Sequence, residues 1–345
     1  MPDVNPDTAA IQSAAHQLEQ GELVAFPTET VYGLGADAEN PQAVAKIYAA
    51  KGRPSNHPVI VHLAPEADIS YWAQAIPAEA RKLIDAFWPG PLTLILKRAA
   101  HIPDTVSGGQ DSIGLRCPSH PVAQALLRAF KHGKGGVAAP SANKFGHVSP
   151  TTAQHVRDEF GDGPESPLAC ILDGGQSEVG IESTILDLSR MASHGPVLLR
   201  PGHISAARIA DVIGVEPRMP DAAAPRASGT LEAHYAPSTP VALVEPAQLE
   251  ESLQRLAIAS RNVALIRRLQ PLMTDVDAQL CLPADPAGYA HDLYAALRAM
   301  DGAGGDIILV EALPVSNEWQ GVNDRLRRAA HDSRGVLERL LNVNP

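Results

Sequence analysis

The last third of the chain alternates short apolar segments with longer amphipathic ones, and this alternation most constrains the fold. Apolar runs of strand length occupy residues 241–244, 263–266, 279–282 and 307–310. Segments with helical periodicity occupy residues 246–258, 286–300 and 319–330. Strands that alternate with helices indicate a parallel sheet, so we predict a small parallel α/β domain over residues 239–345. The segment after its first strand lacks Gly-x-Gly-x-x-Gly, so no dinucleotide site is predicted there.

Residues 1–213 form a longer and less regular series of elements, which we assign to a first domain. Helices are predicted over residues 7–20, with Asp7 as the cap, and over residues 41–50, 77–87, 121–131 and 204–213. Strands are predicted over residues 23–26, 58–63, 92–96, 112–115, 137–139, 168–172, 180–188 and 197–199. Polar residues follow many of these strands, which matters because ligands collect where the strands of an α/β sheet end.

Residues 214–238 separate the two series and are rich in proline, alanine and glycine, with little periodicity. This composition predicts an interdomain linker. The linker ends in a histidine and a tyrosine, His234 and Tyr235, which are unusual in a segment of this kind. They indicate either a packed aromatic hinge or a functional segment.

The chain is acidic, with a formal net charge of −11, and both domains carry a net negative charge. A large nucleic-acid surface is therefore not expected, and any anionic ligand requires a local cluster of cations. The three cysteines have no metal-ligand spacing and are typical of reduced thiols in a cytosolic protein. The sequence predicts neither a signal peptide nor a membrane span, so we expect a cytoplasmic protein.

Lys51 and Arg53 flank a glycine and precede a proline, at the point where a predicted helix passes into a predicted strand. We expect both cations on the connecting loop, where they can bind a phosphate or a carboxylate. The alternative is a solvated basic turn, because most charged side chains face water.

Other polar side chains stand at predicted strand ends, and together they predict one crevice with several arginines and hydroxyls: Thr30, Arg53, Arg116, Ser141 with Asn143, Ser183 with Thr184, and Arg200. Such a set suits a polyphosphate together with a small zwitterion. His62 lies in an apolar strand and is alternatively a core residue, and Ser149 is alternatively a helix cap. The Walker and kinase signatures, the Gly-x-Ser-x-Gly elbow, and the Cys-x-x-Cys and His-x-x-x-His spacings are absent.

Four motifs resemble those of the YrdC-type threonylcarbamoyl-AMP synthase family: Lys-x-Arg at 51–53, Ser-x-Asn at 141–143, the stretch 27–35, and the stretch 180–184. The second domain, with Asn-Asp-Arg-Leu-Arg-Arg-Ala-Ala at 323–330, resembles the long two-domain form of this family. The resemblance implies a YrdC-like twisted mixed sheet with helices, followed by a linker and a small Rossmann-like domain.

The resemblance implies a nucleotidyltransferase that joins L-threonine, bicarbonate and ATP into threonylcarbamoyl-AMP and pyrophosphate. Partner proteins would then transfer the threonylcarbamoyl group to an adenosine beside the tRNA anticodon. Matched to the family's motifs, the residues expected to hold threonine are Thr30, His62, Arg116, Ala139 through its backbone, and Ser183. Those expected to hold ATP are Arg53, His57, Ser112, Ser141, Asn143, Ser149, Arg200 and His234.

The expected chemistry is in-line attack of a threonine carbamate on the α-phosphate, which needs positioning and charge neutralisation more than a dedicated base. Lys51 and Arg53 are the predicted catalytic pair, Arg200 assists them, and Arg116 is expected to pair with the threonine carboxylate. We expect Mg²⁺ to accompany ATP, because it commonly bridges nucleotide phosphates, and we predict no metal ligand from the protein.

Two positions depart from the family pattern. His57 stands where the family commonly has asparagine, and Ala233 stands where some members have a basic residue. We expect the linker segment around His234 to act as a lid over the nucleotide. The alternatives are an RNA-binding module, another carbamoyl-transfer enzyme and a serine hydrolase that uses Ser141.

Overall fold

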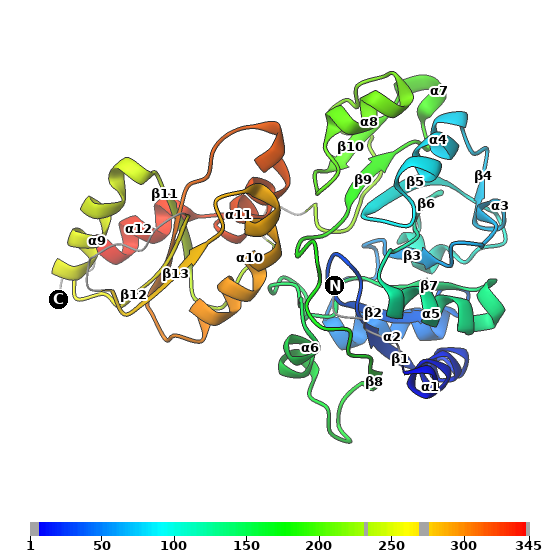
Figure 1. Cartoon of the computed structure of the whole chain (residues 1–345), viewed down its shortest axis with the longest axis horizontal. Helices are drawn as coiled ribbons and strands as arrows, with labels where there is room; N and C mark the ends of the chain where they lie inside the picture. Colours follow the sequence, from blue (N-terminus) through cyan, green and yellow to red (C-terminus); the bar gives the residue numbers. More distant parts are fainter. Residues whose placement is uncertain (1–6, 231–233, 269–275, 343–345) are drawn as a thin grey trace. The chain divides into compact units, whose positions relative to one another are not determined.

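The computed structural model describes residues 7–230, 234–268 and 276–342 (Figure 1). The chain divides into two compact units. The first contains the described residues up to Phe145 together with Ser149–Thr230, and the second contains Gly146–Val148 and the described residues from His234 onward. Residues 214–230 of the predicted linker thus group with the first unit and residues 234–238 with the second, while Ala233 lies outside the described residues. The role of residues 214–238 as a lid stays a prediction.

The first unit is built on a mixed sheet, as predicted, and ten strands belong to it among the described residues. The strand order is β10-β9-β5-β6-β3-β7-β2-β1-β8, and β4 pairs with β5. Neighbours β3 and β6 are parallel, whereas β1 and β2 are antiparallel. The strands are β1 (Leu23–Phe26), β2 (Gly33–Asp37), β3 (Ile60–Leu63), β4 (Ala73–Gln74), β5 (Leu92–Arg98), β6 (Ser112–Arg116), β7 (Gly136–Ala138), β8 (Leu168–Ile171), β9 (Thr184–Asp187) and β10 (Val197–Arg200).

Helices cover both faces of this sheet (Figure 1). On one face pack α2 (Pro41–Lys51), α4 (Ala78–Phe87), α6 (Ala153–Phe160) and α8 (Ala206–Ile213). On the other pack α1 (Thr8–Glu19) and α5 (Pro121–Ala129). The shorter helices are α3 (Ile69–Trp72), α7 (Met191–His194), η1 (Asp104–Ser107) and η2 (Phe130–Gly133).

The alternation of side chains along the strands separates the core from the predicted site. Val61 and Leu63 of β3 and Leu115 of β6 enter the core below α2 and α4. Successive residues of a strand point to opposite faces, so His62 and Arg116 point away from that core. We call this second side of β3 and β6 the site face. The register pairs His62 directly with Arg116 across the two parallel strands.

The second unit contains a parallel sheet, as predicted, in the order β11-β14-β12-β13. Its strands are β11 (Val241–Val244), β12 (Val263–Arg268), β13 (Ala278–Leu282) and β14 (Ile307–Glu311). One face is covered by α9 (Leu249–Ile258) and α12 (Ser333–Asn342), and the other by α10 (Pro286–Asp301) and α11 (Gln320–Ala329) (Figure 1). Short 3₁₀ turns precede α9 and α11, namely η3 (Pro246–Gln248) and η4 (Asn317–Trp319). Helix α12 was not predicted from the sequence.

The local predictions hold best where one apolar face is evident. Helix α1 begins after Asp7, whose carboxylate accepts from the N–H groups of Ala9 and Ala10. Strand β2 was not predicted, because its glycines resemble a turn. A side chain at Gly35 would come within 2.9 Å of the Phe26 ring and of Val137, so this glycine permits close packing inside a strand.

Within the described residues, no helix has both the length and the apolarity to cross a membrane.

Candidate functional site

Lys51 is the last residue of α2, so the prediction that it lies on the following loop is wrong. Gly52 ends the helix in the left-handed conformation, with φ of 64°. The Lys51 side chain is 3% exposed, and its ammonium donates to the carbonyl oxygens of Ser141 at 2.6 Å and Asn143 at 2.5 Å. The alternative of a solvated basic turn is therefore excluded.

Burial lowers the pKa of Lys51 well below its usual value, and the nearby Arg53 guanidinium lowers it further. The carboxylates of Glu159 and Glu182 act in the opposite direction. A Lys ammonium has three donors, and two of them bind backbone carbonyls. One donor is left for a ligand oxygen.

The Ser-x-Asn motif is fastened to the 27–35 stretch by backbone hydrogen bonds. Leu34 donates its N–H to the carbonyl of Pro140, and Ala142 donates to the carbonyl of Tyr32, both at 2.8 Å. The N–H of Phe145 donates to the carbonyl of Lys51, also at 2.8 Å. Three of the four motifs are therefore in direct contact.

Arg53 and Arg200 share one partner, Ser228. A terminal nitrogen of Arg53 lies 3.3 Å from the Ser228 hydroxyl, and a terminal nitrogen of Arg200 donates to the Ser228 carbonyl at 2.8 Å. Both arginines are buried, at 7% and 2% exposed. The structure thus brings together two cations that are far apart in sequence, as the analysis of strand ends predicted.

Arg116 forms a buried ion pair with Glu29, with 2.7 Å between Nη2 and Oε1. Both side chains are 5% exposed. The other oxygen of Glu29 accepts the N–H of Ser119 at 3.1 Å, and the carbonyl of Gly90 lies 3.4 Å from Nε of Arg116. These contacts set the direction of the guanidinium on the site face.

His62 is a neutral imidazole beside this pair. Burial lowers the pKa of His62 to about 3, and the positive charge of Arg116 contributes to the shift. The ring meets Phe26 edge-on at 6.0 Å between centroids. Its burial is that of a core residue, while its register places it next to Arg116. Its role as a threonine ligand stays a prediction.

The other residues predicted for threonine are all buried. The hydroxyl of Thr30 is 2.9 Å from that of Thr28. The N–H of Ala139 donates to the carbonyl of Ile60. The backbone group of Ala139 that can bind a ligand is therefore its own carbonyl. Ser183 lies 2.8 Å from the hydroxyl of Thr93 and also accepts from Arg200 at 3.1 Å.

Three residues predicted for ATP lie in different surroundings. Ser149 is buried and donates to Glu182, and Thr152 rather than Ser149 caps α6. Ser112 is buried at the start of β6. The ring of His57 is half-buried and meets Phe145 edge-on, and burial together with the cations Arg53 and Arg226 lowers its pKa.

His234 belongs to the second unit, and its participation in ATP binding stays a prediction. Its N–H donates to the carbonyl of Arg328 at 3.4 Å, and its ring meets Tyr235 at 4.2 Å. Tyr235 adopts a φ of 61°, which is unfavourable for a bulky residue. The Arg325 guanidinium, 5.5 Å from the Tyr235 ring, helps to hold it in this conformation.

No cluster of three or more histidine, cysteine, aspartate or glutamate side chains suited to a metal occurs in the described part of the chain.

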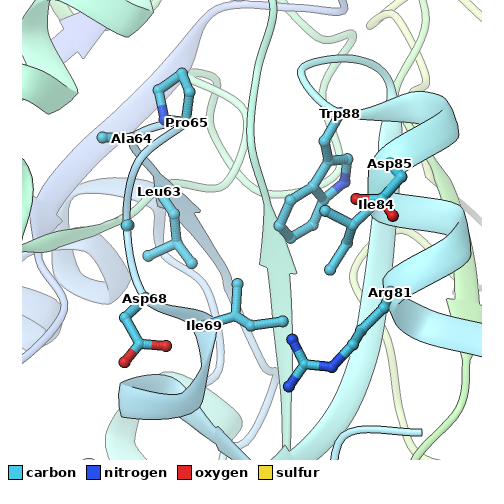
Figure 2. A pocket seen from close by; sticks show the side chains of 10 residues that line it. Leu63, Ala64, Pro65, Asp68, Ile69, Arg81, Ile84, Asp85 and Trp88 are labelled. Atoms are coloured by element: carbon cyan, nitrogen blue, oxygen red, sulfur yellow. The ribbon is translucent and has the colours of Figure 1, made fainter. Parts of the chain in front are cut away.

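A cavity of about 380 Å³ is lined by Leu63, Ala64, Pro65, Ala67, Asp68, Ile69, Arg81, Ile84, Asp85 and Trp88 (Figure 2). Leu63 and Ile84 belong to the core below α2 and α4, whereas Ala64 belongs to the core below α1 and α5. None of the predicted site residues lines it.

Sequence reasoning assigned no role to four residues that contact the predicted site: Glu29, Thr93, Glu182 and Ser228. Two of them, Glu29 and Glu182, lie inside motifs that the sequence analysis named. Thr93 is a polar residue in an otherwise apolar strand, which was an available signal. Ser228 carries no local signal, because its partners come from distant segments.

Two family models match the chain in sequence. One, described as "Telomere recombination", matches residues 16–202. The other, described as "Threonylcarbamoyl-AMP synthase, C-terminal domain", matches residues 204–331.

Curated relatives match nearly the whole chain. It is 39% identical to the threonylcarbamoyl-AMP synthase of Pyrococcus abyssi, over 93% of this chain and 94% of the relative. It is 37% identical to that of Bacillus subtilis, over 95% of each chain. The crystal structure of Sua5 from P. abyssi complexed with L-threonine is similar, with a TM-score of 0.85, 37% identity, and coverage of 95% of this chain and 96% of that one.

Proposed function

The chain belongs to the threonylcarbamoyl-AMP synthase family, and we therefore propose that it joins L-threonine, bicarbonate and ATP into threonylcarbamoyl-AMP and pyrophosphate. The product would supply the threonylcarbamoyl group for an adenosine next to the anticodon of tRNA, through separate transferase proteins. We place this reaction in the cytoplasm, where ATP and tRNA are available.

The observation that carries the proposal is the junction that Lys51 makes between the Lys-x-Arg and Ser-x-Asn motifs. This junction holds one ammonium donor beside two motif loops. Arg53 and Arg200 add two buried guanidinium groups within the same unit. A cluster of three buried cations in an acidic chain suits a polyphosphate.

In the proposed reaction, the amine of threonine first attacks the carbon of bicarbonate, a C–N bond forms, and water leaves, which gives a carbamate. A carbamate oxygen then attacks the α-phosphorus of ATP, the bond to the β-phosphate oxygen breaks, and pyrophosphate leaves with the electron pair. Lys51, Arg53 and Arg200 neutralise charge on the phosphates, and Mg²⁺ enters with ATP as part of the substrate. No general base is required of the protein for this step.

Threonine is proposed to bind on the site face. Arg116 faces its carboxylate, because a guanidinium that binds Glu29 through one nitrogen keeps other donors for a second carboxylate. The carbonyl of Ala139 and the hydroxyls of Thr30 and Ser183 then remain for the amino and hydroxyl groups of threonine.

The test is incubation of the purified full-length protein with ATP, L-threonine and bicarbonate, with release of pyrophosphate followed over time. We expect release that depends on threonine, together with a product of the mass of threonylcarbamoyl-AMP. Release that continues without threonine would refute the proposal. Among the described residues, no histidine is a hydrogen-bond partner of the Ser141 hydroxyl, which argues against a serine hydrolase.

A further inference from the structure

Ser149 and Glu182 form a short hydrogen bond between two buried side chains of the first unit, at 2.5 Å from Oγ to Oε1. Ser149 is 0% exposed and Glu182 is 6% exposed. This length is typical of a hydroxyl that donates to an ionised carboxylate, which is stronger than a bond between neutral groups. Glu182 lies in the 180–184 motif, but neither the family resemblance nor the proposed reaction step assigns it a role.

The hydrogen bond determines what Ser149 can do for a ligand. A serine hydroxyl has one proton and two lone pairs. Its proton is held by Glu182, so Ser149 can only accept a hydrogen bond. Phosphate and carboxylate oxygens are themselves acceptors, and they therefore cannot pair with Ser149 in this state.

Electrostatics favours the same conclusion. A buried carboxylate repels a phosphate that approaches it, whereas it does not repel a neutral hydroxyl. The negative charge of Glu182 is close enough to act on Lys51, which contacts the Ser-x-Asn motif. A neutral part of the nucleotide therefore suits the surroundings of this pair better than a phosphate.

Both partners are held in place by the surrounding backbone. Ser149 precedes Pro150, whose carbonyl accepts the N–H of Tyr32 at 2.9 Å. Glu182 precedes Ser183, whose carbonyl accepts two hydrogen bonds from Arg200, at 3.0 and 2.9 Å. Groups fixed in this way before binding lose little entropy when a ligand arrives.

We propose that the Ser149–Glu182 pair recognises the ribose of ATP, with Ser149 accepting a hydrogen bond from a ribose hydroxyl and Glu182 holding Ser149 in the accepting orientation. This inference rests on the proposed function, because it requires ATP as the nucleotide. Glu182 is here a positioning residue. The hydroxyl of threonine is the other donor of the same chemistry, and the experiment below separates the two.

The experiment measures the dissociation constants of ATP, 2′-deoxyATP and 3′-deoxyATP by calorimetry with the full-length protein. We expect the unsubstituted protein to bind ATP roughly tenfold more tightly than one of the two analogues, which is the scale of one hydrogen bond. Ser149→Ala should bind ATP and that analogue equally. Glu182→Ala should lose most of the preference, and Glu182→Gln should keep part of it, because its amide oxygen still accepts from Ser149.

Ser107→Ala is the matched control, since Ser107 is also a buried serine whose hydroxyl donates within the first unit. It should keep the full preference for ATP. Thermal unfolding of each variant identifies any that does not fold. Because the readout is a ratio of two affinities measured on one protein, Ser149→Ala tests the inference even if Glu182→Ala does not fold.

Equal binding of ATP and both deoxy analogues by the unsubstituted protein would overturn the inference, as would a full preference that persists in Ser149→Ala. Weaker binding of inorganic tripolyphosphate by Ser149→Ala would show instead that Ser149 contacts phosphate. A change in the selectivity for L-threonine over L-2-aminobutyrate, without a change for the deoxy analogues, would reassign the pair to threonine. Failure of the unsubstituted protein to bind ATP at all would refute the proposed function itself.

Discussion

The guanidinium of Arg116 lies 2.7 Å from the carboxylate of Glu29, in an ion pair that is almost fully buried. Glu29 lies in the 27–35 motif, whereas Arg116 is the last residue of β6 and lies outside the four motifs. Removal of one partner leaves the other charge buried without compensation, which costs far more than the loss of a surface pair.

We predict that Arg116→Ala weakens threonine binding much more than ATP binding. Loss of the partner of the threonine carboxylate should cost about 2–5 kcal/mol of binding free energy. Calorimetric titration with each substrate measures both effects. Arg128→Ala is the control, because Arg128 pairs with Glu66 at the surface and such pairs contribute about 0–1 kcal/mol. An equal loss of affinity for both substrates would contradict the predicted role.

Lys51→Met should lower the rate of pyrophosphate release by roughly a hundredfold or more, because it removes a charge that faces the phosphates. Methionine keeps most of the side-chain volume of lysine. The substitution also removes the free-energy cost of burying the ammonium group. The free energy of unfolding should therefore change by less than about 3 kcal/mol. Rates are measured with saturating ATP, and stability is measured by urea denaturation.

The matched control for Lys51 is Lys144→Met. Lys144 also donates to a backbone carbonyl, that of Ala50, at 2.8 Å. It lies outside the predicted set of ligands, so its rate should stay within about threefold of the unsubstituted protein. A similar loss of rate in both variants would mean that Lys51 only holds the Ser-x-Asn motif in place and does not act on the phosphates.

His62 should make the protein less stable in acid. The folded state holds His62 neutral down to a pKa of about 3, whereas the unfolded chain binds a proton near pH 6.5. The unfolded state thus binds more protons in this window, and stability falls as the pH is lowered from about 6.5 towards 3. Between pH 6.5 and 4 the loss should be about 3 kcal/mol, since one pKa unit corresponds to about 1.4 kcal/mol.

The measurement for His62 is urea denaturation at several pH values, for the unsubstituted protein and for His62→Gln. The variant should show a smaller loss of stability in acid, because glutamine does not titrate. Identical pH dependence in the two proteins would mean that His62 is not held neutral.

Asp324→Ala should strongly destabilise the second unit. Asp324 lies 2.9 Å from Arg325, which is 0% exposed, and 3.0 Å from Arg328. Burial opposes ionisation, but the three neighbouring arginines keep the pKa of Asp324 below its usual value. Loss of this carboxylate should cost about 3–5 kcal/mol of unfolding free energy. Asp332→Ala removes the partner of an exposed pair with Arg339 and should cost less than about 1 kcal/mol.

The predicted lid can be tested with two shortened chains. A chain that ends at residue 214 keeps the main core of the first unit but lacks Ser228, the shared partner of Arg53 and Arg200. A chain that ends at residue 230 keeps Ser228 and lacks His234. We expect both to fold, as judged by cooperative thermal unfolding, and both to lose most threonine-dependent pyrophosphate release. Full activity of either chain would refute a requirement for His234.

The predictions from sequence were most accurate for local features. The helix after Asp7 and the strand 23–26 follow from apolar periodicity over a few residues, and both are confirmed. The parallel sheet of the second unit follows from the same patterns. Errors occurred where packing overrides local preference, as at the glycines of β2.

The sequence by itself determined most of the helices and strands, the class of each sheet and the motifs that carry the proposed chemistry, because these depend on residues close together in the chain. Only the tertiary structure decided that Lys51 is buried, that Glu29 is the partner of Arg116, and that the proton of Ser149 is held by Glu182. These contacts join residues far apart in sequence, such as Lys51 and Ser141, which are 90 positions apart. Their existence depends on the order of strands in the sheet, which local patterns do not encode.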